Sequence, residues 1–306
     1  MNELVTKKKK LFSGKKENLT AYLFLSPALV TFFVFIGGPI FATIFFLDFS
    51  KYNIISPIKI VGIQNFARMF ADPEMAVAFI NTLKFVVILV PLHVFIALIL
   101  ALLVTRKIST PFKYFYRTSI YFPTIVTVSA VTVVWTYLFN YDFGVLNYLL
   151  NVLNLNSVPW LKSGSWALVS VAIFSVWKNV GNSFIFYVIG LQNIPDTYIE
   201  AAQIDGASPL RIFFNIKLPL LSPTVFFVLT INLIACVQIF DEPFLITNGG
   251  PGDSTQTIAW QIYTQAFRNF NMGYASAIAT FLFIIIAVIT MIQFSLQNKW
   301  VNYDYE

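Results

Sequence analysis

The segment from Glu200 to Pro219 is a polar interruption in an otherwise apolar chain, and its residue types suit docking against another protein. Ala201 and Ala202 would give a helix a smooth side that another chain can approach closely. Glu200 leaves a carboxylate free to meet a basic group of a partner. Gly206 lets the backbone turn at positive φ without steric cost.

The same segment contains the signals that start and stop two short helices. Pro195 suits the start of the first helix, and Gly206 suits its left-handed C-terminal cap. Ser208 is a favourable cap for a second helix that has Pro209 in its first turn. We expect Pro219 to end the loop before the next apolar stretch.

The composition indicates what must position this loop. Apolar residues make up 58% of the 306 positions, aromatic residues 17% and charged residues only 11%, which a soluble surface cannot accommodate. Apolar runs of about 20 residues without strict alternation predict membrane-spanning helices rather than a barrel. The predicted fold is therefore all-α and polytopic, with six transmembrane helices. Their expected ranges are about 20–47, 77–104, 117–140, 165–190, 218–246 and 271–297.

The distribution of Lys and Arg predicts the orientation of these helices, because short basic loops stay in the cytoplasm. Six lysines precede the first apolar run, which is too long for a cleaved secretory signal and is expected to be retained. Residues 1–19 are then a basic cytoplasmic tail, and 20–306 form the membrane domain. Both termini face the cytoplasm, as does the loop 191–217 between helices four and five. The net charge of +6 is explained by contact with anionic lipid headgroups and needs no nucleic acid.

The loop pattern resembles the signature cytoplasmic loop of binding-protein-dependent ABC importer permeases. Glu200-Ala-Ala, three residues, Gly206, nine residues, Ile216, one residue and Leu218-Pro219 match that pattern in full. Other segments look like the carbohydrate (maltose or oligosaccharide) type of these permeases: Asn81–Leu83, Trp135, Gly144–Asn147, Leu245–Gly252 and Met272–Ala275.

This resemblance implies a type I ABC importer permease fold with a cytoplasmic coupling helix between helices four and five. It implies a second homologous permease, expected to be a different chain, two cytoplasmic ATPase subunits and an extracellular solute-binding protein. The location implied is a bacterial-type inner cell membrane, and the cargo a sugar, expected to be an oligosaccharide. The ATPase-coupling residues would be Glu200, Ala201, Ala202, Asp205, Gly206, Ile216, Leu218 and Pro219.

The chain is not expected to be an enzyme or to bind a cofactor itself. It has no phosphate-binding loop, and the Gly249–Ser254 run lacks the necessary lysine, so ATP and Mg would belong to the partner ATPases. That run is expected to form a tight extracellular turn. One histidine and one cysteine exclude a Cys/His metal cluster within the chain. His93 is expected to be a packed, neutral residue bonded to a neighbouring helix.

Polar and aromatic groups at membrane depth are costly unless they pair or line a wet cavity, so they are candidates for a substrate path. Amides and a carboxylate can hydrogen-bond sugar hydroxyls, and aromatic rings can stack on a pyranose. The candidates are Trp135, Tyr137, Trp177, Lys178, Asn179, Asn182, Asn232, Gln238 and Asp241. Hydrogen bonding between helices explains each of them equally well, and Lys178 could pair with Asp241 or Glu242.

The sequence leaves four alternatives open. The same class of importer could carry a non-sugar cargo such as a glycerol phosphate. An ion-coupled secondary transporter could work alone, with Lys178 and Asp241 as a charge relay. The chain could also be a non-transporting scaffold, and the loop a plain interfacial hairpin.

Overall fold

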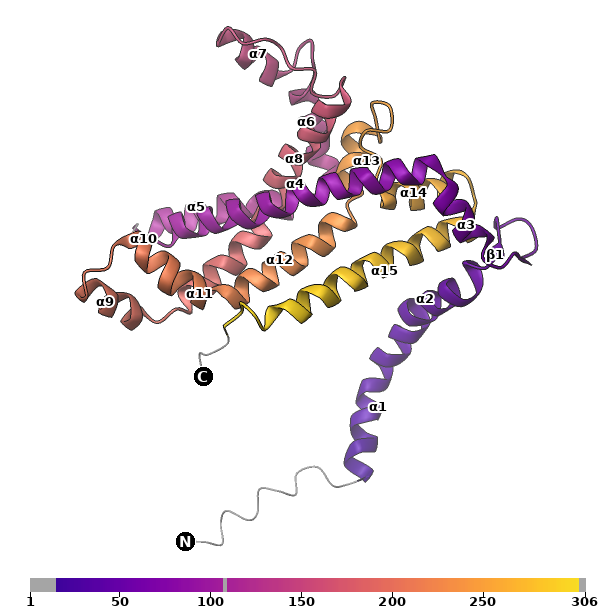
Figure 1. The fold of residues 1–306 in the computed structure, drawn as a ribbon, viewed down its shortest axis with the longest axis horizontal. Helices are drawn as coiled ribbons and strands as arrows, with labels where there is room; N and C mark the ends of the chain where they lie inside the picture. The colour runs from indigo at the N-terminus through magenta and orange to yellow at the C-terminus, as the bar shows by residue number, and fades with distance from the viewer. Residues whose placement is uncertain (1–14, 107–108, 303–306) are drawn as a thin grey trace.

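A computed structural model describes residues 15–106 and 109–302 of the chain (Figure 1). Lys7 to Lys10, most of the expected basic tail and Lys107 therefore lie outside the described residues. Almost every described element is helical, apart from one short hairpin in which β1 (Ser50–Lys51) pairs antiparallel with β2 (Lys59–Ile60).

The first apolar run forms a continuous helical segment from Leu19 to Leu47 that leads away from the remaining helices (Figure 1). It consists of α1 (Lys15–Phe32) and α2 (Gly38–Ala42), each followed by a π-helical turn, Phe33–Gly37 and Thr43–Leu47. Proline lacks the N–H that a regular helix needs and crowds the preceding turn, so Pro39 favours the wide turn just before it.

Four elements form the packed centre of the molecule. They are α4 (Pro73–Val104), α8 (Gly164–Gln192), α12 (Ser222–Val237) and α15 (Met272–Gln297). Helix α4 packs against both α8 and α12, and α12 also contacts α15. The core between α4, α8 and α12 contains fully buried side chains such as Phe85, Phe174, Phe184 and Leu221, and α15 packs in a second cluster with Val237 at the end of α12. This core fixes the walls between which polar side chains can face one another.

The helix expected over 117–140 is broken in the structure. Helix α5 (Thr110–Ile125) and α6 (Val128–Leu138) meet at an angle of 99°. Val126 and Thr127 adopt extended backbone between them, just after Pro123. Both halves are apolar, so hydropathy shows one continuous apolar stretch and does not reveal the bend.

The helix expected over 218–246 is also divided. A helical segment covers Pro209–Leu220 as α10 (Pro209–Ile212), a π-helical turn and α11 (Leu218–Leu220), and it bends by 67° into α12. Pro219 therefore lies inside this segment and does not end the loop, because the bend falls one residue after Leu220. Helix α12 ends at Val237, and the separate helix α13 (Asp241–Thr247) follows.

Within the described residues, four single helices are long and apolar enough to cross a membrane, and up to six spans result if each bent pair crosses once. The single helices are Leu19–Leu47, Pro73–Val104, Gly164–Gln192 and Met272–Gln297. The remaining elements are shorter: α3 (Gln64–Ala71), α7 (Val145–Val152), α9 (Asp196–Ile204) and α14 (Ile258–Tyr263), which continues into a π-helical turn at Thr264–Arg268.

Candidate functional site

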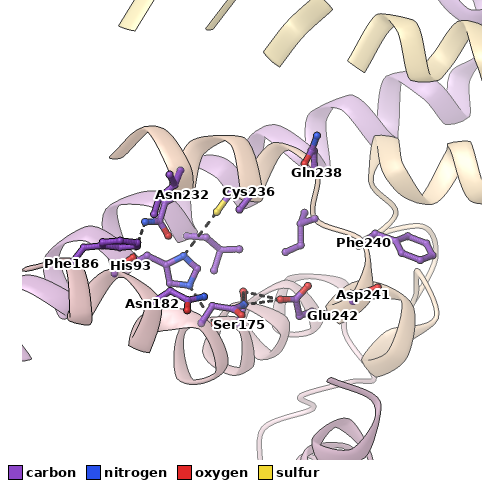
Figure 2. A pocket seen from close by; sticks show the side chains of 16 residues that line it. His93, Ser175, Asn182, Phe186, Asn232, Cys236, Gln238, Phe240, Asp241 and Glu242 are labelled. Carbon is purple, nitrogen blue, oxygen red and sulfur yellow. Dashed lines mark hydrogen bonds between the residues drawn. The ribbon is translucent and has the colours of Figure 1, made fainter. Parts of the chain in front are cut away.

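A cavity of about 720 Å³ opens between α4, α8, α12 and α13 (Figure 2). Its lining is rich in hydroxyls, amides and carboxylates. The polar lining residues are His93, Ser175, Asn179, Asn182, Ser183, Asn232, Gln238, Asp241 and Glu242. Both carboxylates come from the first turn of α13, where they complement the positive end of the helix.

Glu242 is the centre of one hydrogen-bond group in the cavity. Its side chain is buried, and its Oε1 accepts from Asn179 Nδ2 at 2.9 Å and from Ser175 Oγ at 3.4 Å, both on α8 (Figure 2). These bonds hold the start of α13 against α8. The Asp241 side chain also faces the cavity, so two acidic groups lie on the same wall.

A second polar group joins α4, α8 and α12. Asn232 Nδ2 donates to Ser183 Oγ at 2.8 Å and to the Val228 carbonyl at 2.7 Å. His93 Nε2 lies 3.3 Å from the Ser175 carbonyl, and its Nδ1 lies 4.0 Å from Cys236 Sγ. The expected contact of His93 with a neighbouring helix is therefore present, and the ring also reaches the cavity lining.

The structure brings five of the nine candidate path residues to this cavity: Asn179, Asn182, Asn232, Gln238 and Asp241. Sequence reasoning overlooked Ser175 and Ser183 and named Glu242 only as a partner for Lys178. A signal was present in α8, because positions 175, 179 and 183 follow at intervals of four and so share one helix face.

The aromatic candidates lie elsewhere. Trp135 packs against Trp177 and Phe139, with ring centroids 5.2 and 5.3 Å apart, and Tyr137 packs against Phe143 at 5.3 Å. None of Trp135, Tyr137 and Trp177 lines the cavity. In this arrangement their rings join α6 and α8 to each other and to neighbouring turns.

Lys178 is also outside the cavity lining, and its side chain is buried. Its Nζ donates to the Thr124 carbonyl at 3.0 Å, in the last turn of α5, where helix carbonyls lack partners of their own. Across 15–106 and 109–302, no carboxylate lies within 4.0 Å of this nitrogen. Lys178 therefore caps the end of a broken helix and forms no close ion pair with Asp241 or Glu242, although Glu242 is near enough to interact with its charge.

The polar loop forms the two expected short helices. Helix α9 begins after Pro195, Gly206 follows it with φ of +75°, and Ser208 Oγ accepts from the Arg211 N–H at 3.4 Å to cap α10. Glu200 is exposed on α9. The expectation of capped helices on either side of a glycine turn is thus confirmed.

The motif residues fall into two groups. Glu200, Ala201, Asp205 and Gly206 are exposed at the free end of the hairpin, with Ala202 half-buried beside them. Ile216, Leu218 and Pro219 are half-buried in the helical segment that leads into α12. The exposed group and the cavity residue Asn232 are therefore connected through one chain of helices.

Also confirmed is the tight turn after α13. Asn248, Gly249 and Gly252 have φ values of 50°, 82° and 51°, which suit asparagine and glycine. An added Cβ at Gly249 would lie 3.0 Å from the Trp260 ring, so this position also needs a small residue.

Long apolar helices around a polar cavity, with a helical hairpin exposed at one end, define the class of polytopic membrane permeases. The fold is similar to a solved bacterial alginate ABC transporter in complex with an alginate pentasaccharide-bound periplasmic protein, with a TM-score of 0.80 and 21% identity over 93% of this chain and 96% of that chain. This is the type I ABC importer permease fold. Residues 93–303 match the family described as "Binding-protein-dependent transport system inner membrane component", and the chain belongs to this family.

Two relatives illustrate the range within this similarity. The sulfoquinovosyl glycerol transport system permease protein SmoG of Agrobacterium fabrum is 33% identical over 278 residues, covering 90% of this chain and 89% of SmoG. The sn-glycerol-3-phosphate transport system permease protein UgpA of the same organism is 32% identical over 287 residues, covering 92% and 96%. The chain is therefore a multi-pass permease component of a binding-protein-dependent ABC transporter, as the loop pattern predicted.

Proposed function

We propose that this permease forms half of the import pathway for a sugar, most suitably an oligosaccharide. An extracellular binding protein would deliver the cargo, and two cytoplasmic ATPase subunits, holding ATP and Mg, would supply the energy. A second, different permease of the same family would complete the pathway. The proposed location is a bacterial inner membrane with both termini in the cytoplasm.

The observation that carries the cargo proposal is the lining of the 720 Å³ cavity. Amides and hydroxyls such as those of Asn179, Asn182 and Ser183 match the alternating donors and acceptors of a sugar. Phe186 and Phe240 add apolar surface for the C–H faces of the rings. Asp241 and Glu242 accept strong hydrogen bonds from hydroxyls.

The loop supports the coupling part of the proposal. Glu200 and its neighbours on α9 would insert into a cleft of an ATPase subunit. When the two ATPases close on ATP, they would draw the two loops together and turn the pathway outward as a rigid-body population shift. The helical segment Pro209–Leu220 would pass this movement to α12, which carries Asn232.

Substitutions in α9 and its turn test the coupling. We expect Glu200→Ala and Gly206→Val to reduce ATPase association and cargo uptake by the assembled importer. Gly206→Asn is the matched control, because asparagine adopts positive φ far more readily than valine and nothing lies within 4 Å of the added Cβ. Normal association and normal uptake in both Glu200→Ala and Gly206→Val would reject the coupling role.

A glycerol phosphate is the second candidate cargo, favoured by the similarity to UgpA. The cavity lining argues for a neutral sugar instead, because it contains two carboxylates and no Lys or Arg of the described residues. A cargo phosphate in this cavity would lie close to both carboxylates, and like charges repel strongly inside a protein. Binding assays with the cognate extracellular receptor separate the two: a receptor that binds glycerol phosphate and no glycan would overturn the sugar proposal.

The lone secondary transporter is less well supported, because Lys178 bonds to a backbone carbonyl rather than to an acidic partner. It requires uptake by the purified chain in vesicles without any ATPase. We expect no such uptake, and its detection would replace the ATP-driven mechanism.

A further inference from the structure

A second hollow, of about 440 Å³, lies between the end of α4 and the helical segment Pro209–Leu220. It is separate from the cargo cavity and shares no lining residue with it. Two of its lining residues are cations, Arg106 after the end of α4 and Lys217 on the helical segment, and the rest are mostly apolar. The other lining residues are Leu102, Thr105, Pro209, Leu210, Phe213 and Phe214.

The two cations have no acidic partner of their own. Among the described residues, no carboxylate lies within 4.0 Å of Arg106 or Lys217. Lys217 is nevertheless half-buried, so part of its hydration has been lost. Two basic groups lining one hollow without a counter-charge form a site that an anion would complete.

The depth of the hollow points to the chemistry of that anion. The membrane-spanning helix α4 ends at Val104, so Arg106 stands two residues beyond the span, at the level of the lipid headgroups. Leu102 lies one turn deeper, on the apolar side of Arg106. A single occupant would therefore meet positive charge at the membrane surface and hydrocarbon below it.

The apolar wall is also left open to its surroundings. Leu210 is 71% exposed and Phe214 58% exposed, and these two side chains line the hollow beside Lys217. Exposed apolar groups at the edge of a membrane-spanning helix are stable when they face acyl chains. An inorganic anion would satisfy the cations but would leave this wall uncovered.

We propose that this hollow binds an anionic phospholipid. The phosphate of the headgroup would lie between Arg106 and Lys217, and an acyl chain would follow Leu102, Phe213 and Phe214. The lipid would join α4 to the helical segment that connects α9 and its glycine turn with α12. The proposal rests on the membrane location of the chain and on no assumption about the cargo or the ATPases.

The test uses the assembled importer purified in detergent and native mass spectrometry to count bound lipids. Phosphatidylglycerol and phosphatidylcholine with identical acyl chains are added in turn. We expect the wild type to prefer phosphatidylglycerol, and the double variant Arg106→Gln/Lys217→Gln to lose about twenty-five-fold in that preference, at roughly five-fold for each cation. The matched control is Lys113→Gln/Lys299→Gln, which removes the same charge outside the hollow and should retain the preference.

Three results would overturn the proposal. Equal loss in both double variants would mean that overall charge alone attracts the lipid. Complete competition by inorganic phosphate would indicate a site for a free anion rather than for a lipid. Unchanged lipid binding with reduced ATPase association in Arg106→Gln/Lys217→Gln would assign the two cations to an acidic protein partner. Melting temperatures of the two variants show whether each is folded, and Lys217→Gln alone, with an expected five-fold loss, replaces the double variant if it is not.

Discussion

At the scale of single residues, Glu242 is the side chain on which the proposed choice of cargo depends. It is buried, bonded to Asn179 and part of a lining that contains no Lys or Arg among the described residues. With an effective dielectric constant of about 20, two negative charges about 8 Å apart repel by roughly 2 kcal/mol. In the proposed pathway the carboxylate would act against anionic cargo while its oxygens still accept bonds from neutral hydroxyls.

We predict that Glu242→Gln lowers the preference of the assembled importer for a neutral oligosaccharide over its uronic-acid counterpart by about ten-fold or more. Glutamine keeps the shape and an acceptor for Asn179, so mainly the charge changes. Uptake into vesicles is compared at receptor-saturating concentrations of each sugar. Asp253→Asn, an exposed acidic residue outside the cavity, is the control, and an unchanged ratio in Glu242→Gln would contradict the electrostatic explanation.

Asp48 is a second informative residue, at the junction between the first span and α15. Its side chain is 1% exposed, so the carboxyl group has lost nearly all of its contact with water. Burial raises the pKa of this carboxyl above its ordinary value, and the Thr280 hydroxyl only partly offsets the effect. Because the pKa is higher in the folded than in the unfolded state, the ionised group destabilises the fold, and protonation at falling pH relieves that cost.

Asp48→Asn should therefore raise the melting temperature of the purified chain at pH 7. The gain over wild type should shrink as the pH falls through the raised pKa towards about 4, the value of an unfolded aspartate. Asp142→Asn, an exposed residue in a surface salt bridge with Lys162, should change stability little. A constant difference across this pH range would show that ionisation of Asp48 is not the cause.

At the scale of elements, α5 and α8 approach closely at Gly181. An added Cβ there would overlap Thr124 Oγ1 and would lie 2.8 Å from the Ile120 carbonyl oxygen, which belongs to the backbone and yields little. At Gly190, also in α8, the nearest atoms to an added Cβ belong to the side chains of Thr224 and Leu221, which yield more readily than a backbone carbonyl. The two glycines share one helix, so an alanine gains the same helix propensity at both.

Gly181→Ala should consequently destabilise the chain by about 1 to 3 kcal/mol, and by more than Gly190→Ala. Thermal unfolding of the two purified variants, followed by loss of helical circular dichroism, measures the difference. Equal melting temperatures of the two variants would contradict the expectation that the close packing of α5 against α8 makes Gly181 the less tolerant position.

The elements also show what the sequence could and could not predict. Length and hydropathy were sufficient for long helices such as α4 and α15, because those properties alone decide whether a helix can span a membrane. The break at Val126 was missed because apolar residues continue on both sides of it. Capping signals predicted the loop helices, since they act within a few residues of the chain.

The cavity shows the same division between local and long-range information. Polar residues within apolar runs indicated which side chains needed partners, and five of them face the cavity. The bond between Asn179 and Glu242 joins residues 63 positions apart, and no local pattern contains that pairing. The direction of Lys178 likewise depends on the end of α5, whose position follows from the unpredicted break.

At the scale of the whole molecule, the rest of the chain leaves most of the apolar surface of the first span uncovered. Only 6% of its most apolar window is buried inside the chain. Its attachment lies at the far end, where Asn65 Nδ2 donates to the carbonyls of Asp48 and Ser50 at 2.9 Å. At Gly273 of α15, an added Cβ would overlap the Ser50 carbonyl oxygen, so the junction needs glycine there. A helix that is apolar on all sides is stable only in lipid or against another protein.

The number of membrane crossings depends on whether each bent pair of helices spans the membrane once or re-enters it. Between positions 203 and 269, the only described helices that pass the length and hydropathy test are the bent pair Pro209–Leu220 and Ser222–Val237. If that pair crosses, Gln203 and Asn269 lie on opposite sides, and if it re-enters, they lie on the same side. Both residues are exposed, and the buried Cys236 can be replaced by alanine to give a background without cysteine.

We predict opposite sides. In intact cells, a membrane-impermeant maleimide should label Asn269→Cys and leave Gln203→Cys unlabelled, while inside-out vesicles stripped of peripheral proteins should show the reverse. Labelling after detergent treatment controls for accessibility at both sites. Labelling of both positions from one side would mean that the bent pair re-enters the membrane. Labelling of Gln203→Cys from outside the cell would remove α9 from the reach of any cytoplasmic ATPase, and with it the proposed source of the force that moves α12.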